Sequence, residues 1–142
     1  MFKRLTDTML VAPQIDVAGV AEAAAQGVTL IINNRPDGEA AGQPPGADIA
    51  TAAQAAGIAY CAIPVTQAGF SMPQVAAMAD AIAGAEGAVL AYCRSGTRST
   101  HLWALSQASR GADVDLLTEA AAEAGYDLMA LRAMLDMLKA SA

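Results

Sequence analysis

Four short apolar runs recur along the chain, and this pattern constrains the fold more than any other feature. The runs cover 9–12, 28–32, 59–63 and 88–92. Three of them are continuous rather than alternating, which is typical of strands covered on both faces. Alanine-rich stretches with helical character follow at 17–26, 47–56 and 72–84. Strands that alternate with helices predict a three-layer α/β/α sandwich with a mostly parallel sheet of four to five strands.

After the fourth run the pattern becomes entirely helical. Helices are expected over 99–109, 114–124 and 127–139, separated by Gly111 and Gly125. A chain of 142 residues is large enough to bury one core, and it contains no long linker, repeat or charge block. We therefore predict one domain over 1–142 with a helical C-terminal part.

Composition limits the partners and cofactors to be expected. The net charge is −6 and only eight scattered residues are basic, which disfavours nucleic acid as a partner. No apolar run approaches the length of a membrane span, and no leader segment follows Met1, so we expect no membrane partner and a cytoplasmic protein. One histidine and two distant cysteines do not make a metal site, and no dinucleotide or P-loop motif is present. We expect no cofactor.

Three polar loops follow the predicted strands. They cover 33–46, 64–71 and 93–98. Because sites in open α/β sheets form at the carboxyl ends of strands, these loops are expected to converge on one site.

The loop after the fourth strand carries the clearest chemical signal, in the stretch "AYCRSGTRST". Cys93 ends an apolar run, and Arg94 and Arg98 flank a short polar turn before a helix. If this turn is sharp, its backbone N–H groups form an anion-binding nest that the helix N-terminus reinforces. A thiol in such a positive field ionises more easily, and only the thiolate is a good nucleophile.

Two further residues of the loop support this interpretation. Gly96 permits a positive φ or a close backbone approach, and Ser99 can cap the helix or donate a hydrogen bond to the thiolate. The alternative is a buried, inert core thiol, which is the role expected for Cys61. The glycine and two arginines within five residues favour a nucleophilic Cys93.

The motif "CRSGTRS" resembles the active-site loop of rhodanese sulfurtransferases and the phosphate loop of tyrosine and dual-specificity phosphatases. Over roughly 9–110, chiefly through "NNRPDGE" and "CRSGTRS", the chain is similar to a bacterial family, the beta-lactamase-hydrolase-like, phosphatase-like family. This resemblance implies a phosphatase-like fold. Relatives of the domain are fused to persulfide dioxygenases and sulfide:quinone oxidoreductases, which implies sulfur chemistry and a partner enzyme of sulfur oxidation.

Two features distinguish phosphate from sulfur chemistry. The phosphatase pattern places an arginine after five intervening residues, whereas only four separate Cys93 from Arg98, and Ser99 holds the phosphatase position. The loop "PVTQAGFS" over 64–71 also lacks the acid that protonates a leaving oxygen. Asp37, Glu39 or His101 are the remaining candidates for an acid or base.

The main expectation is therefore a cysteine-dependent sulfurtransferase that forms a Cys93 persulfide from a small anionic donor such as thiosulfate or a persulfide. The alternative is a phosphatase that cleaves a phosphate ester through a Cys93 phosphocysteine, and a further alternative is a weakly catalytic anion- or persulfide-binding module. Arg35 would extend the anion site, although "RPDG" is also a good turn sequence, and Thr66 would supply a neutral hydrogen bond. The predicted catalytic residues are Cys93 and Arg98, and the predicted substrate-binding residues are Arg94, Ser95, Gly96, Thr97, Ser99, Arg35 and Thr66.

Overall fold

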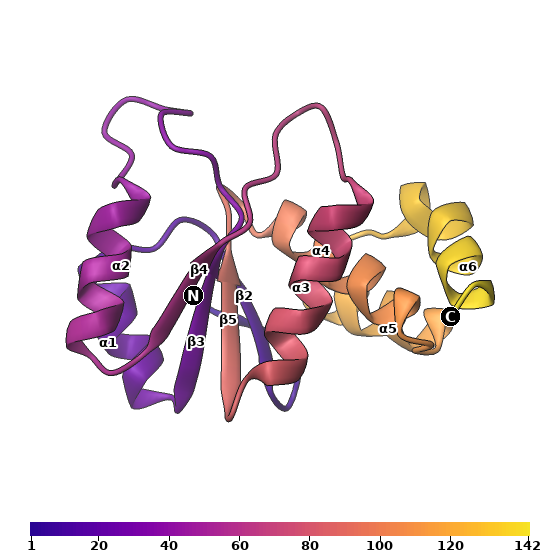
Figure 1. Cartoon of the computed structure of the whole chain (residues 1–142), viewed down its shortest axis with the longest axis horizontal. Helices are drawn as coiled ribbons and strands as arrows, with labels where there is room; N and C mark the ends of the chain where they lie inside the picture. Colours follow the sequence, from indigo (N-terminus) through magenta and orange to yellow (C-terminus); the bar gives the residue numbers. More distant parts are fainter.

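A five-stranded sheet forms the middle layer of the protein, which is represented by a computed structural model that describes residues 1–142 (Figure 1). Its strands are β1 (Lys3–Thr6), β2 (Met9–Ala12), β3 (Val28–Asn33), β4 (Ala59–Ala62) and β5 (Ala88–Tyr92). They lie in the order β1-β2-β5-β3-β4. Only β1 is antiparallel to its neighbour, so the mostly parallel sheet predicted from the sequence is confirmed.

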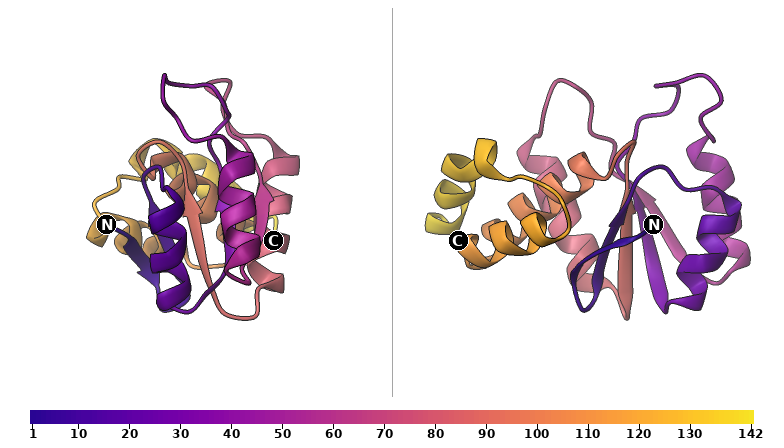
Figure 2. Two further views of the ribbon diagram at one scale, coloured as in Figure 1. Left: turned by 90° about the vertical axis from the view of Figure 1, so that its left-hand side faces the viewer. Right: turned by 180° about the vertical axis from the view of Figure 1, so that it is seen from behind.

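Helices cover both faces of this sheet. The elements are α1 (Val17–Ala25), α2 (Gly46–Ala55), α3 (Met72–Gly84), α4 (Thr97–Ser109), α5 (Val114–Glu123), the 3₁₀ turn η1 (Met129–Leu131) and α6 (Arg132–Ala140). One layer contains α1 and α2, and the opposite layer contains α3 and α4 (Figure 1). Helices α5 and α6 pack on α4, and α5 also contacts the edge strand β1 (Figure 2). None of these helices combines the length and the apolar character that crossing a membrane requires.

The central strand β5 shows why the apolar runs are continuous. Leu90 and Tyr92 belong to the core under α1 and α2, whereas Val89 and Ala91 belong to the core under α3 and α4. Successive residues of a strand point to opposite faces, so a strand covered on both sides needs apolar residues at every position. The carboxyl end of β5 is thereby fixed between two packed layers, and Cys93 follows directly.

Some boundaries differ from the sequence-based expectations. Strand β1 was not predicted because only Leu5 of its four residues is buried, so it carries no apolar pattern. Helix α4 begins at Thr97, two residues before the predicted start, which places Arg98 in its first turn. The last helix begins at Arg132 rather than near Asp127, because a 3₁₀ turn precedes it. Strand β4 is a partly exposed edge strand, which leaves Cys61 half-buried.

Candidate active site

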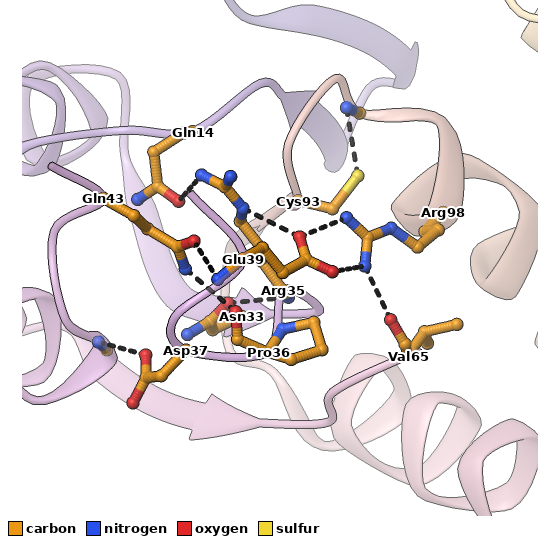
Figure 3. A network of polar contacts seen from close by, with 12 residues as sticks. Gln14, Asn33, Arg35, Pro36, Asp37, Glu39, Gln43, Val65, Cys93 and Arg98 are labelled. Atoms are coloured by element: carbon orange, nitrogen blue, oxygen red, sulfur yellow. Dashed lines mark hydrogen bonds and ion pairs between the residues drawn. The ribbon is translucent and has the colours of Figure 1, made fainter. Parts of the chain in front are cut away.

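The Cys93 loop, residues 93–98, turns sharply between β5 and α4 at the carboxyl end of the sheet. The side chain of Cys93 has no exposed surface, and its Sγ accepts a hydrogen bond from the Gly96 backbone N–H at 3.1 Å (Figure 3). Gly96 is the N-cap of α4 and has φ of +91°, a left-handed conformation that favours glycine. The loop therefore holds the sulfur against a backbone donor at the N-terminus of α4, where the helix dipole favours negative charge.

Arg98 extends from the first turn of α4 and ties two other loops to the Cys93 loop. Its Nη1 and Nη2 donate to the two carboxylate oxygens of Glu39, each at 2.8 Å, and Nη1 also donates to the Val65 carbonyl at 2.7 Å (Figure 3). The carboxylate of Glu39 raises the pKa of Arg98, and Cys93 adds to this effect. The guanidinium fork that would bind a planar face of an oxyanion is thus occupied by a carboxylate of the same chain.

Glu39 lies between two arginines. In addition to the Arg98 contacts, its Oε1 accepts from the Nε of Arg35 at 3.0 Å. These hydrogen bonds, from Arg98 first, outweigh the effect of partial burial and lower the pKa of Glu39 to about 2. In this arrangement Glu39 is ionised at neutral pH and has no proton to donate.

The segment 34–45 that carries Glu39, here called the Glu39 loop, is held by its own side chains. Gln43 accepts from the Glu39 backbone N–H at 3.0 Å and donates to the Pro36 carbonyl at 2.9 Å. Asp37 accepts from the Gly46 N–H at 2.8 Å, so its carboxylate caps the start of α2. Asp37, a candidate acid in the sequence, therefore binds a backbone N–H at the end of the Glu39 loop.

A pocket of about 480 Å³ opens beside these groups, and it is polar. Its lining consists of Pro36, Glu39, Thr66, Gln67, Arg94 and Arg98. The three loops predicted to converge do meet here, since each contributes to this lining. Two arginines and a single carboxylate face the pocket, which suits a small anion able to compete with Glu39 for Arg98.

Arg35 belongs to the same network without lining this pocket. It is buried, and it donates Nε to Glu39 and Nη1 to the Gln14 side chain at 3.1 Å. It lines a neighbouring pocket of about 500 Å³ together with Thr66, which is shared by both pockets. Arg35 is thus connected to the pocket beside Arg98 through its bond to Glu39.

The small polar residues of the loop have separate tasks. Ser99 is buried and donates to the Asn34 side chain at 2.8 Å rather than to Cys93, and Asn34 in turn donates to the Ile63 carbonyl at 2.9 Å. These bonds join the start of α4 to the ends of β3 and β4. Ser95 and Thr97 are exposed and bond to each other through their hydroxyl groups at 3.0 Å.

His101 lies one turn along α4 and is not among the residues that line the pocket. Its Nε2 is 3.3 Å from the Asp127 carbonyl, and its ring contacts that of Phe70. Burial lowers the pKa of His101. From α4 its ring reaches the loop over 64–71 and the C-terminal segment, and no hydrogen bond joins it to Cys93.

Two residues of the site were not identified from the sequence. Gln14 bonds to Arg35 through its side chain, and its backbone N–H donates to the Arg94 carbonyl at 3.3 Å. Its position just after the first apolar run was a usable signal, because that run also ends at the carboxyl edge of the sheet. Tyr126 donates its hydroxyl to the Ser95 carbonyl at 3.0 Å, and nothing in its local sequence predicts this contact.

Comparisons with known proteins agree with this geometry. The model of the family described as "Beta-lactamase hydrolase-like protein, phosphatase-like domain" matches residues 1–110. The chain is 39% identical over 108 residues to the beta-lactamase hydrolase-like protein of Agrobacterium fabrum, covering 76% of this chain and 25% of that protein. The corresponding protein of Xylella fastidiosa is 43% identical over 88 residues, covering 62% and 20%. The chain thus spans about a quarter or less of the curated relatives it matches.

Solved structures extend the likeness over the whole chain. A crystal structure of a putative phosphatase from Neisseria meningitidis has a TM-score of 0.83, 35% identity and 96% coverage of each chain. The structure of PTPMT1 has a TM-score of 0.76 at 13% identity and covers 99% of this chain and 97% of that one, which shows a shared fold. With the family match covering the sheet, the Glu39 loop and the whole Cys93 loop, the chain belongs to the phosphatase-like domain family of the beta-lactamase hydrolase-like proteins.

Proposed function

We propose that this domain is a cysteine-dependent phosphatase that hydrolyses a small phosphate monoester through a Cys93 phosphocysteine. The observation that carries the proposal is the buried Cys93 sulfur held by the Gly96 N–H, with Arg98 beside it at a polar pocket. The phosphatase fold supports the same activity. Sulfur transfer, which was the main expectation from the sequence, is therefore the second candidate.

Substrate binding would require an exchange of partners on Arg98. The phosphate oxygens would replace the Glu39 carboxylate on the guanidinium fork, while the exposed Arg94 adds positive charge at the pocket. Arg98 also donates to the Val65 carbonyl, which holds its side chain in place while the carboxylate leaves. Since Cys93 has no exposed surface, this movement would also give the phosphorus access to the sulfur.

The chemical steps would follow from this placement. The Cys93 thiolate attacks phosphorus, the sulfur–phosphorus bond forms, and the ester bond breaks with its electron pair on the leaving oxygen. Backbone N–H groups of the loop and Arg98 stabilise the charge on the transferring phosphoryl oxygens. Water then attacks the phosphocysteine, which releases inorganic phosphate and regenerates the thiolate.

The pocket also limits the leaving group. Glu39 is its one carboxylate, and the two arginines keep that group ionised. General acid catalysis is typically worth about 10²–10⁴-fold, so an alkoxide leaving group would depart slowly here. We infer that aryl phosphates, whose phenolate leaves without a proton, are cleaved faster than alkyl phosphates.

Sulfane-sulfur transfer is the second candidate, and the spacing of the loop favours it. Arg98 follows Cys93 after four residues rather than five, which makes a tighter cradle than the phosphatase pattern. The Cys93 thiolate would attack the outer sulfur of thiosulfate, the S–S bond would break, and sulfite would leave. A thiol acceptor would then attack the outer sulfur of the persulfide and return the thiolate. No acid is needed in either step.

Steady-state rates with two substrate sets distinguish these candidates. We expect turnover of aryl phosphates, a steep dependence of kcat/KM on the acidity of the phenol, and no thiocyanate from thiosulfate and cyanide. Thiocyanate formation without phosphate release would overturn the phosphatase proposal in favour of sulfur transfer. Tight binding of phosphate with no turnover of either set would instead indicate a binding module.

A further inference from the structure

Tyr126 contacts the Cys93 loop from a distant part of the chain. It lies between α5 and η1, beyond the residues that the family model matches. Its half-buried ring lies over Gly96, where a Cβ atom would collide with the phenol oxygen. Its hydroxyl donates to the Ser95 carbonyl at 3.0 Å. Any side chain at position 96 would therefore displace this ring.

One peptide group connects Tyr126 to the nucleophile. The carbonyl of Ser95 and the N–H of Gly96 belong to the same trans peptide, so they point in opposite directions. The carbonyl accepts from the Tyr126 hydroxyl, and the N–H donates to the Cys93 sulfur at 3.1 Å. Three groups thus form a continuous chain from phenol to peptide to sulfur.

We propose that Tyr126 is a positioning residue that stabilises the Cys93 thiolate through the Ser95–Gly96 peptide. A hydrogen bond accepted by a carbonyl polarises the amide and strengthens its N–H as a donor, by roughly 10–30% in condensed-phase estimates. The same bond fixes the plane of the peptide, so the N–H stays aimed at the sulfur. The proposal deepens the proposed function and rests on it only in taking the Cys93 thiolate as the reacting group.

The electrostatic surroundings agree with a donor role for the phenol. Burial, and next the nearby Cys93, raise the pKa of Tyr126, so the hydroxyl keeps its proton at neutral pH. The other charged groups of this loop and pocket are Arg98, Glu39, which is bonded to it, and the exposed Arg94, which follows Cys93 in the chain. His101 on the same helix faces Asp127 instead. A change at Tyr126 leaves all of these in place.

The test measures alkylation of Cys93 by iodoacetamide, in which the thiolate carbon–sulfur bond forms and iodide leaves. It needs no substrate, so its result does not depend on whether the enzyme cleaves phosphate or transfers sulfur. Cys61→Ser is the background, which leaves Cys93 as the one thiol. Tyr126→Phe removes the hydroxyl and keeps the ring.

We expect Tyr126→Phe to slow alkylation about 1.5- to fourfold at pH 6, the loss expected when a charge-assisted hydrogen bond weakens by roughly 10–30%. At pH 10, where a cysteine is ordinarily a thiolate, the rate should change less than about 1.3-fold. Thr51→Val is the matched control, because the Thr51 hydroxyl also donates to a backbone carbonyl, that of Ala47, but lies on α2 away from the Cys93 loop. It should leave both rates unchanged. An equal loss at both pH values would reduce Tyr126 to a packing residue, and an unchanged rate at pH 6 would overturn the proposal.

A second substitution keeps the ring and the hydroxyl and changes only the strength of the donor. A fluorinated tyrosine at position 126 is a more acidic phenol that remains protonated at pH 6. It should accelerate alkylation at pH 6, the direction opposite to Tyr126→Phe, while the melting temperature stays the same. Slower or unchanged alkylation with this residue would contradict transmission through the peptide.

Discussion

The Cys93 loop and the Glu39 loop meet at the same edge of the sheet but are built in different ways. In the Cys93 loop a backbone N–H from Gly96 holds the sulfur, and the turn depends on one glycine with positive φ. In the Glu39 loop side chains make the decisive bonds, and Glu39 joins Arg35 to an arginine 59 residues away. The first arrangement is local and the second depends on distant partners.

Because of this difference, the Cys93 loop is the fixed part of the site and the Glu39 carboxylate is the part that another anion can replace. A peptide donor cannot leave a nucleophile without unfolding of the turn, so the Cys93 loop is preorganised for charge on sulfur. A carboxylate on a guanidinium fork can be replaced by another anion of similar geometry. Glu39 is therefore expected to act as the group that a substrate displaces, and the following changes test that division.

The largest effect is expected from Cys93→Ser. A hydroxyl at this position ionises far less readily than a thiol, so kcat/KM should fall by at least about 10³-fold whichever substrate is turned over. Steady-state assays measure the loss, and Cys61→Ser on the edge strand should keep the wild-type rate. Activity retained in Cys93→Ser would remove the Cys93 loop from the reaction.

Arg98→Lys should have the next largest effect. Lysine keeps the charge but loses the fork that reaches two oxygens at once, and we expect kcat/KM to fall about 10²-fold. Arg110→Lys, on the exposed end of the same helix, is the control. A lysine variant with the wild-type rate would mean that charge alone suffices and that the fork geometry is unimportant.

Glu39→Gln should strengthen anion binding. The amide removes the negative charge that competes for Arg98, so the inhibition constant of inorganic phosphate should decrease about three- to tenfold. Glu123→Gln, an exposed change of the same charge on α5, should leave that constant unaltered. Weaker phosphate binding in Glu39→Gln would show that the carboxylate orders the site rather than competing for it.

The smallest effect concerns stability and pH. Because the folded-state pKa of Glu39 lies near 2, below its ordinary value of 4.5, its ion pairs stabilise the fold above pH 4.5. That stabilisation is lost as the pH falls from about 4.5 to about 2. We expect Glu39→Gln to lower the free energy of unfolding by about 0.5–1 kcal/mol at pH 7, a value typical of partly exposed pairs.

Urea unfolding of the wild type and Glu39→Gln at pH 7 and pH 2 measures this contribution. The difference between the two proteins should shrink at the lower pH, because the wild-type carboxyl is then about half protonated in the folded state and fully protonated in the unfolded state. A difference that stays constant would mean that the charge of Glu39 does not contribute, and that the substitution acts through packing of the Glu39 loop.

Most of the fold was predictable because it follows from local patterns. Continuous apolar runs and intervening helices predicted the parallel strands, and capping residues such as Ser71 marked helix starts. The two elements whose position or extent was not predicted lack such patterns. Strand β1 has one buried residue and pairs at an edge, and the last helix starts late because η1 uses the residues after Asp127.

In the candidate site, too, the features that local sequence patterns determine were predictable and the long-range contacts were not. The sequence by itself determined the Cys93 loop, because a strand end, a glycine and a helix start fix the turn within a few residues. Only the tertiary structure decided that Glu39 occupies Arg98, that Ser99 bonds to Asn34, and that Tyr126 covers Gly96. Each of these contacts joins residues that are 30 or more positions apart. Such partners are selected by the packing of whole layers, which leaves no local pattern in the chain.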